Sequence, residues 1–486
     1  MSIKDLEPKV VWNNFYNLTR IPRPSKHEGK VIEYLYNWGV SHGFETIRDK
    51  GGNIIIRVPA TPGLENRRGI IIQGHMDMVP QKTSDSSHNF LEDPIDAYID
   101  GEWVTADRTT LGADNGMGVA LGLSAIEDPS VKHGPIEILV TYDEETGMTG
   151  ANTLEPGVLQ GDILLNLDSE QEGELCVGCA GGLDATARFK YRKYITPKGY
   201  KGLSVTVKGL QGGHSGMDIS LYRANANKAV ARMILPVMEL LGVKVVSFTG
   251  GSLRNAIPFE ASAQLAVPGE NLQAVRQMIE NEFGRIKAEF AESDPTATLI
   301  VEECAAAPKH IQPSVMLRAV KAMLACPSGV IRMSRTMKGL TETSINMAIV
   351  RTEKGAVTIH SLMRSSVNSA KAALATRVRC IFELAGADSV EFAGGYSGWT
   401  PKLDTPMNKI LMDQYEKVTG EKMEIMATHG GIECALLGAK YPNWEMVSVG
   451  PTIKYPHSPD EKVNIASVAR TWEYLKAVLE NVPVKK

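Results

Sequence analysis

The feature that most constrains this chain is a short apolar run at residues 70–78, which reads Ile-Ile-Ile-Gln-Gly-His-Met-Asp-Met. An apolar run of this length ahead of a glycine predicts a central strand of a parallel sheet. Side chains two positions apart on a strand point to the same face, so His75 and Asp77 are expected to lie together at its end. His75 would then bind a metal through one ring nitrogen while Asp77 holds the other nitrogen. An ordinary surface loop containing a His and an Asp is the alternative that this segment alone leaves open.

The length and composition indicate a globular protein of two domains. The 486 residues exceed the length at which a single hydrophobic core keeps growing. With 43% hydrophobic residues, 22% charged residues and a net charge of -4, nothing points to a nucleic-acid-binding surface. The first residues lack an apolar signal core and no run of about 18 apolar residues occurs, so neither export by a signal peptide nor a membrane span is expected. Six scattered cysteines suit a reducing cytoplasm and do not form the pattern of a disulfide framework.

Strand and helix patterns alternate in the first part of the chain, which predicts an α/β layer with a largely parallel sheet. The expected strands span residues 53–58, 69–73, 136–142 and 162–168, a helix is expected over 115–127, and a hairpin over 343–351 and 356–364. Ser25-Lys-His-Glu28 has the pattern of a capping box ahead of an amphipathic helix. Ligands of such sheets bind at the carboxyl ends of the strands, which is where the acidic and histidine clusters of this sequence fall.

A change in amino-acid composition predicts the start of a second domain. Residues 191–200 are polar and punctuated by Pro and Gly, which predicts a linker, so we place a boundary near residue 188. Beyond it, strands and helices mix without strict alternation. We therefore expect an inserted α+β domain over residues 188–393, with Gly394-Gly-Tyr-Ser-Gly as the return linker. Residues 1–187 and 394–486 would together form the α/β domain.

Two groups of acidic residues follow the expected strands. Asp114 opens a helix in the Gly-rich segment Thr109-Thr-Leu-Gly-Ala-Asp-Asn-Gly, where it is a candidate ligand, although this segment alone favours an ordinary N-cap. Asp143, Glu144 and Glu145 come directly after a strand, where a purely structural role has little need of so much charge. Adjacent side chains there point apart, so one glutamate can bind a metal while its neighbour faces a substrate.

Asp168 and His457 complete the set of candidate ligands. Asp168 ends another expected strand, and His457 lies in the Pro-rich loop Gly450-Pro-Thr-Ile-Lys-Tyr-Pro-His-Ser-Pro, whose rigidity suits a ligand. Three carboxylates and two imidazoles fit borderline divalent ions such as zinc, cobalt or manganese, whereas an all-oxygen set would favour magnesium or calcium. Two ions are the natural count, with one bridging carboxylate plus one histidine and one acid for each. Such a pair leaves room for a water whose pKa the metals lower.

Six motifs together resemble the dinuclear zinc exopeptidases of the M20 class. They are His75-Met-Asp-Met, Gly112-Ala-Asp-Asn-Gly, Glu144-Glu-Thr-Gly, Asp168-Ser-Glu, Gly212-Gly-His-Ser-Gly and Pro456-His-Ser-Pro-Asp-Glu. The resemblance runs in order from near residue 10 to near residue 480, and it is strongest to the bacterial branch that cleaves aminoacyl-histidine dipeptides. It implies a zinc-exopeptidase catalytic domain of the phosphorylase/hydrolase-like fold, and an inserted domain that acts as a lid and in dimerisation.

The resemblance also implies how the ligands divide between the two ions. His75 and Asp168 become the terminal ligands of one ion, Glu145 and His457 those of the other, and Asp114 the bridge. It further implies a cis peptide bond after Asp114.

Catalytic and substrate-binding roles follow from the same resemblance. Glu144 becomes the general base for attack of a metal-bound water, Asp77 orients His75, and His214 of the lid stabilises the tetrahedral intermediate. In dimeric relatives such a histidine comes from the partner chain. Arg364 is the preferred clamp for a substrate carboxylate, with a surface ion pair as the alternative. Arg254 and Asn255 are further candidate substrate contacts, and Gly430-Gly-Ile-Glu433 is expected to shape the pocket.

These observations predict a cytoplasmic metal-dependent dipeptidase that holds two divalent ions, most simply Zn2+, and acts on unblocked dipeptides, favouring those that end in histidine. The expected partners are a small dipeptide and a second copy of the chain, joined through the lid, with no nucleic acid and no membrane. An N-acyl amino acid deacylase or a tripeptidase is the alternative enzyme. A metal- or peptide-binding protein without catalysis is the alternative of another class, and the presence of Glu144 beside all five ligands argues against it. Cys176-Val-Gly-Cys179 has no second pair and is interpreted as packed thiols.

Overall fold

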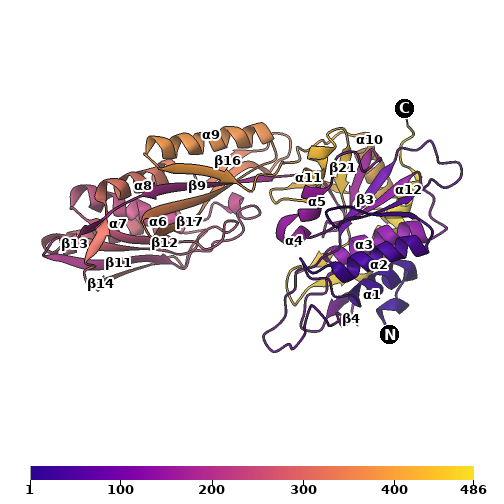
Figure 1. Ribbon diagram of the computed structural model, residues 1–486, viewed down its shortest axis with the longest axis horizontal. Helices are drawn as coiled ribbons and strands as arrows, with labels where there is room; N and C mark the ends of the chain where they lie inside the picture. The colour runs from indigo at the N-terminus through magenta and orange to yellow at the C-terminus, as the bar shows by residue number, and fades with distance from the viewer. Residues whose placement is uncertain (1, 486) are drawn as a thin grey trace. The chain divides into compact units, whose positions relative to one another are not determined.

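The computed structural model describes residues 2–485, and its contacts divide the chain into two compact units (Figure 1). The first unit contains the chain up to Gly178, Pro401–Ala427 and the chain from Ile432 on. The second contains Cys179–Thr400 and Thr428–Gly431. These boundaries lie outside those predicted at residues 188 and 393. Strand β9 (Gly181–Lys190) explains the first difference, because it pairs along its length with β18 of the second unit (Ala356–Ser365).

An eight-stranded mixed sheet forms the centre of the first unit. Its strands, in spatial order, are β1 (Glu45–Arg48), β2 (Ile54–Val58), β6 (Ile136–Thr141), β3 (Ile70–His75), β7 (Ile163–Asn166), β21 (Glu445–Ser448), β8 (Glu174–Cys179) and β20 (Glu424–Thr428). The four central strands, β6, β3, β7 and β21, run parallel to one another, whereas β1 pairs antiparallel with β2, β2 with β6, and β21 with β8. The α/β class is confirmed. The expectation of a largely parallel sheet holds only for the centre, because β1 joins β2 through a short turn that forces them antiparallel.

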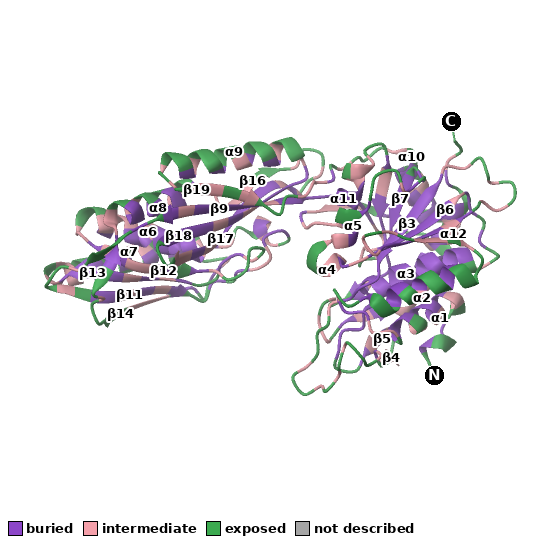
Figure 2. Cartoon of the chain, viewed as in Figure 1, coloured by how far each residue is buried: buried purple, intermediate pink, exposed green. Residues whose placement is uncertain are grey.

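Helices cover this sheet. They are α1 (Lys9–Thr19), α2 (Gly29–Ser41), α3 (Ala113–Glu127), α4 (Glu144–Gly147), α5 (Thr149–Thr153), α10 (Pro406–Thr419), α11 (Glu433–Lys440) and α12 (Ile465–Glu480). Helix α3 packs on β3 and on α1, and it is buried almost along its whole length (Figure 2). Its small residues, Gly118, Ala120 and Gly122 among them, permit this close approach to the sheet.

The predicted capping box at Ser25 is wrong. Helix α2 begins after Glu28, and no side chain caps its first turn. The Ser25 hydroxyl instead donates to Asp77 Oδ2 over 2.8 Å, so this serine supports the strand end that carries His75.

A small four-stranded sheet completes the first unit. Its strands are β22 (Ile453–Lys454), β23 (Lys462–Asn464), β5 (Trp103–Ala106) and β4 (Ala97–Asp100). The loop between β22 and β23 carries His457. Among residues 2–485, none of the helices combines the length and the apolar character that crossing a membrane requires.

The second unit is built on a nine-stranded antiparallel sheet. Its strands are β14 (Thr298–Cys304), β11 (Tyr200–Lys208), β13 (Ala261–Pro268), β12 (Lys244–Gly250), β17 (Thr341–Glu353), β18, β9 and β19 (Ser389–Ala393), with β16 (Gly329–Met333) beside β17. Its helices are α6 (Ala226–Leu240), α7 (Leu272–Glu289), α8 (Pro313–Ala325) and α9 (Asn368–Leu384). The predicted hairpin is confirmed as β17 and β18. The predicted linker at residues 191–200 is wrong, because it contains β10 (Lys193–Ile195), which pairs with β15 (Lys309–Ile311).

Candidate active site

The parallel centre of the first sheet brings three strand ends to one edge. The buried strand β3 ends at His75, which lies opposite Thr141 of β6, and Gln73 of β3 lies opposite Asn166 of β7. The acids after β6 and after β7 therefore reach the same edge as His75. This is the position at which parallel sheets bind ligands.

Asp114 lies between two imidazole rings. Its Oδ1 is 3.1 Å from His75 Nε2, and its Oδ2 is 3.0 Å from His457 Nε2. The backbone of α3 kinks at Asp114 and Asn115, and both Asp114 oxygens face imidazole nitrogens, which favours a ligand role for Asp114 over an ordinary N-cap. The peptide bond between Asp114 and Asn115 is cis, as the family resemblance implies.

Two further acids each approach one of these imidazoles. Asp168 Oδ1 lies 3.4 Å from His75 Nε2, and Glu145 Oε2 lies 3.0 Å from His457 Nε2. The structure thus brings all five candidate ligands together as two groups that share Asp114. This is the grouping that the family resemblance implies for two ions.

The chemistry of this cluster fits divalent cations. Glu145 Oε1 and Asp168 Oδ1 are buried and have no hydrogen-bond partner among the described residues. Buried carboxylate oxygens without a donor are costly, and a bound cation removes that cost. Burial raises the pKa of Asp168 to about 6, with Asp114 and Glu145 adding to the rise while His75 opposes it. Such crowding of negative charge is what two dications would relieve.

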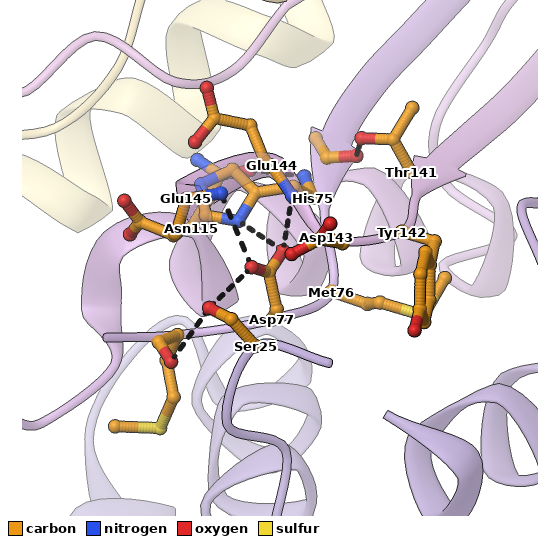
Figure 3. Close-up of polar contacts among 12 residues, drawn as sticks. Ser25, His75, Met76, Asp77, Asn115, Thr141, Tyr142, Asp143, Glu144 and Glu145 are labelled. Carbon is orange, nitrogen blue, oxygen red and sulfur yellow. Dashed lines mark hydrogen bonds and ion pairs between the residues drawn. The ribbon is translucent and has the colours of Figure 1, made fainter. Parts of the chain in front are cut away.

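Asp77 connects His75 to the turn that carries the glutamates (Figure 3). It is fully buried, and its Oδ1 lies 3.3 Å from His75 Nδ1 and accepts a hydrogen bond of 3.0 Å from the Glu144 backbone N–H. Its Oδ2 accepts from Ser25 Oγ and from the Glu145 N–H. Burial alone would raise the pKa of Asp77, but the His75 ring and these donors lower it to about 2. The proton of His75 therefore belongs on Nδ1, which leaves Nε2 for a metal.

Glu144 and Glu145 leave their turn in different directions, as the strand-end argument predicts (Figure 3). Glu145 approaches His457, whereas no hydrogen bond involves the Glu144 carboxylate among the described residues. Burial raises the pKa of Glu144 well above its ordinary value, with the charges of Glu433, Asp168 and Glu145 contributing. A half-buried carboxylate with a raised pKa and no hydrogen-bond partner among the described residues suits the role of a base.

Comparison with known proteins decides the family. The model of Peptidase family M20/M25/M40 matches residues 71–481, which is most of the chain. The chain belongs to peptidase family M20/M25/M40. As a member of this family it is a metal-dependent peptidase. The Cytosol non-specific dipeptidase of Escherichia coli (strain K12) is 41% identical to this M20 peptidase over 483 residues, which cover 99% of each chain.

Solved structures agree with this membership. The aminoacylhistidine dipeptidase from Vibrio alginolyticus superposes with a TM-score of 0.93 at 45% identity, over 100% of this M20 peptidase and 99% of that chain. An aminopeptidase from Bacillus cereus superposes with a TM-score of 0.58 at 17% identity, over 98% and 99% of the two chains, and that likeness concerns the fold alone.

Four predicted site residues of the M20 peptidase lie in its second unit, His214 among them. The Met217 backbone N–H donates to His214 Nδ1 over 3.2 Å, so the ring proton of the neutral imidazole lies on Nε2. Burial lowers the pKa of His214, and the positive charge of Arg364 lowers it further. His214 can therefore present a neutral N–H donor at Nε2.

Arg364 is buried, with 5% of its surface exposed. Its guanidinium donates to the hydroxyl groups of Ser215 (3.4 Å) and Tyr396 (3.3 Å), and no carboxylate within residues 2–485 lies within salt-bridge distance of it. The alternative of a surface ion pair is therefore wrong. A buried guanidinium without a carboxylate partner is suited to binding an anionic ligand.

The other two predicted substrate contacts differ from Arg364. Arg254 forms an ion pair with Asp184, and its side chain is largely exposed. Asn255 is exposed, and its backbone carbonyl accepts from the Ser215 N–H over 2.7 Å. The loop that follows His214 thus contacts both Asn255 and Arg364, while Arg254 is engaged elsewhere.

Sequence reasoning missed several polar residues near these sites. Glu433, expected only to shape a pocket, is fully buried, accepts from Gln73 Nε2 (2.7 Å) and Thr141 Oγ1 (2.6 Å), and has its pKa raised to about 8 by burial. Tyr396, assigned to a linker, has its ring between Gly182 and Gly431, where a Cβ on either glycine would clash with it. Because Gly182 and Gly431 approach Tyr396 only in the folded chain, no local pattern in the sequence points to this residue.

Proposed function

We propose that this protein is a dipeptidase with two divalent metal ions in the site formed by β3, β6, β7 and the β22–β23 loop. The observation that carries the proposal is the position of Asp114, whose two oxygens lie 3.1 and 3.0 Å from two different imidazoles. His75 and Asp168 would complete one metal site, and Glu145 and His457 the other. Mixed nitrogen and oxygen ligands favour Zn2+, with Co2+ and Mn2+ as alternatives.

The bound ions would supply Lewis acidity, which lowers the pKa of a water and polarises the peptide carbonyl. Glu144 takes the proton from the attacking water on its carboxylate and passes it to the leaving amine, for which its high proton affinity is suited. Asp77 holds the Nδ1 proton of His75 and so fixes the ring. His214 donates from Nε2 to the oxygen that becomes negative in the tetrahedral intermediate.

The proposed substrates are unblocked dipeptides, with those ending in histidine favoured. Support comes from the two full-length relatives, one named a non-specific dipeptidase and the other an aminoacylhistidine dipeptidase. Arg364 would bind the C-terminal carboxylate through two hydrogen bonds, because its guanidinium is buried and has no carboxylate partner among the described residues. Asn255 is a weaker candidate contact, and the ion pair with Asp184 makes Arg254 the weakest.

The cellular setting belongs to the same proposal. A cytoplasmic location is supported by the name of the Escherichia coli relative, a cytosol dipeptidase, and by the cysteine pattern. We further propose a homodimer joined through the second unit, in which His214 serves the site of the partner chain. Support comes from the family resemblance and from the placement of His214 in a different unit from the metal ligands.

A panel of three histidine derivatives and one tripeptide, alanyl-alanyl-histidine, tests the dipeptidase proposal. Alanyl-histidine, β-alanyl-histidine and N-acetyl-histidine share the same C-terminal residue and differ in the group before it. We expect turnover of the first two and none of the third. Turnover of N-acetyl-histidine alone would favour a deacylase instead, and turnover of alanyl-alanyl-histidine above that of both dipeptides would favour a tripeptidase. Tight binding of dipeptide with zinc present but no product would favour a protein without catalysis.

A further inference from the structure

A buried carboxylate outside the ligand set holds the turn that carries Asp114. Glu461 is 1% exposed and follows His457 by four residues in the same loop. Its Oε2 accepts from the backbone N–H groups of Leu111 (2.8 Å) and Gly112 (2.9 Å), and its Oε1 accepts from the Asp114 N–H (3.1 Å). One side chain from the β22–β23 loop therefore binds three N–H groups at the start of α3.

A buried cation holds the same turn from its carbonyl side. Arg23 Nη2 donates to the Gly112 carbonyl, and Nη1 donates to the carbonyls of Met76 and Asp77, both over 3.0 Å. Gly112 thus donates its N–H to Glu461 and accepts from Arg23 at its carbonyl oxygen. Gly112 has a φ of 72°, and a Cβ there would lie 2.6 Å from Arg23 Nη2, so glycine alone fits this close approach.

The two proposed metal sites depend on this arrangement to different degrees. The ion at His75 would have two ligands placed by the sheet, because His75 ends β3 and Asp168 lies two residues after β7. Asp77 also fixes the His75 ring. His457 lies in a loop, with half of its side chain exposed. The ion at His457 would therefore rely most on Asp114 and on the β22–β23 loop, which are the two segments that Glu461 joins.

We propose that Glu461 is a positioning residue that sets Asp114 between the two ions and ties it to the loop of His457. This inference rests on the proposed dinuclear site. Loss of the Glu461 carboxylate should weaken the ion at His457 more than the ion at His75. A merely structural role would lower the stability of the protein without changing the difference between the two metal-binding steps.

The test is a titration of the metal-depleted full-length protein with Co2+, followed by calorimetry and by the visible absorption of the bound ion. Parent protein should bind two equivalents. Glu461→Gln puts an NH2 group against backbone N–H donors, so we expect the first equivalent within threefold of the parent and the second weakened by about 10–100-fold. Asp460→Asn is the matched control, because Asp460 is an exposed acid of the same loop and should bind like the parent.

Glu461→Asp keeps the charge but shortens the side chain, so it should fall between the parent and Glu461→Gln, and it decides the question if the Gln variant does not fold. Parent-like binding of both equivalents by the folded Glu461 variants would overturn the proposal, as would equal weakening of both equivalents. If the parent protein itself binds a single equivalent of Co2+, the proposal of a dinuclear site fails. That failure can be told apart from a failure of the Glu461 proposal, because it is seen in the protein that retains Glu461.

Discussion

Asp77→Asn isolates the contribution of one fully buried carboxylate to the site. The carboxylate accepts from the Glu144 N–H (3.0 Å), the Glu145 N–H (3.3 Å) and Ser25 Oγ (2.8 Å), and faces His75 Nδ1 at 3.3 Å. The substitution keeps the shape of the side chain but replaces one acceptor oxygen with an NH2 group. Because backbone donors surround both oxygens, that NH2 group must face at least one N–H.

The expected size of the effect follows from these contacts. A hydrogen bond to a charged group contributes about 1.5–3 kcal/mol, and Asn loses one or two of them. A loss of about 3 kcal/mol corresponds to roughly 100-fold in an equilibrium constant, which is at the upper end of the 10–100-fold typical for partners of metal ligands. Ser25→Ala is the matched control, because it removes one donor and leaves the charge, and should cost about 1.5 kcal/mol, the low end of that range, or roughly tenfold.

The assay is the affinity of metal-depleted protein for Zn2+, measured by competition with a chelator, together with kcat/KM for alanyl-histidine. Asp77→Asn should weaken the binding of the ion at His75 by roughly 100-fold and reduce kcat/KM by a similar factor, whereas Ser25→Ala should change each by only about tenfold. Parent-like metal affinity in a folded Asp77→Asn protein would refute the idea that Asp77 acts through His75. Equal losses in the two variants would show that the Ser25 contact, and not the charge, matters.

Three further outcomes are expected. Glu144→Gln should retain both metals and lose on the order of 100-fold or more in the rate of dipeptide hydrolysis, while Glu145→Gln should lower the occupancy of one metal. Equal metal loss in the two variants, measured by elemental analysis, would show that Glu144 is a ligand and not the base. Mixing inactive His214→Ala and Glu144→Ala proteins under subunit exchange should restore activity if His214 acts in the partner's site, and the mixture should stay inactive if it acts in its own chain. Burial and the charge of Arg364 lower the pKa of His429 to about 3 in the folded protein. As the pH falls below about 6.5, His429 therefore becomes protonated in the unfolded chain but not in the folded one, and the free energy of unfolding decreases. Urea unfolding measures this free energy between pH 6 and 4. Its decrease with falling pH should be smaller in His429→Gln than in the parent protein, by up to about 1.4 kcal/mol per pH unit, and identical slopes in the two proteins would contradict this.

The sequence predicts those parts of the fold that depend on local pattern. The buried strands β3, β6 and β7 are visible because their apolar runs are nearly continuous, and the β17–β18 hairpin because its strands alternate around a short turn. The half-exposed strands β1 and β4 carry no such signal and were not predicted. The first boundary was misplaced because β9 contains polar and charged residues that resemble the start of a linker, although its other face is buried in the second sheet.

In the candidate site, too, the features that depend on local pattern can be predicted from the sequence, and those that depend on tertiary contacts cannot. Four of the five candidate ligands can be proposed from the sequence because each ends or follows a strand or lies in a Pro-rich loop, whereas Asp114 at the start of a helix becomes a candidate bridge only through the family resemblance. Glu461 belongs to one of the quoted motifs, yet its function depends on backbone N–H groups some 350 positions earlier in the chain. Such pairings are set by tertiary packing, and no local pattern in a single sequence predicts them.

Activity as a function of metal content tests the central claim most directly. Metal-depleted protein should be inactive toward alanyl-histidine. Stepwise addition of Zn2+ should bring turnover to its maximum at two equivalents per chain, and a His75→Ala protein should not recover at any ratio. Full turnover by protein shown by elemental analysis to hold no metal, or a maximum reached at one equivalent and unchanged by the second, would contradict a dipeptidase that works with two metal ions.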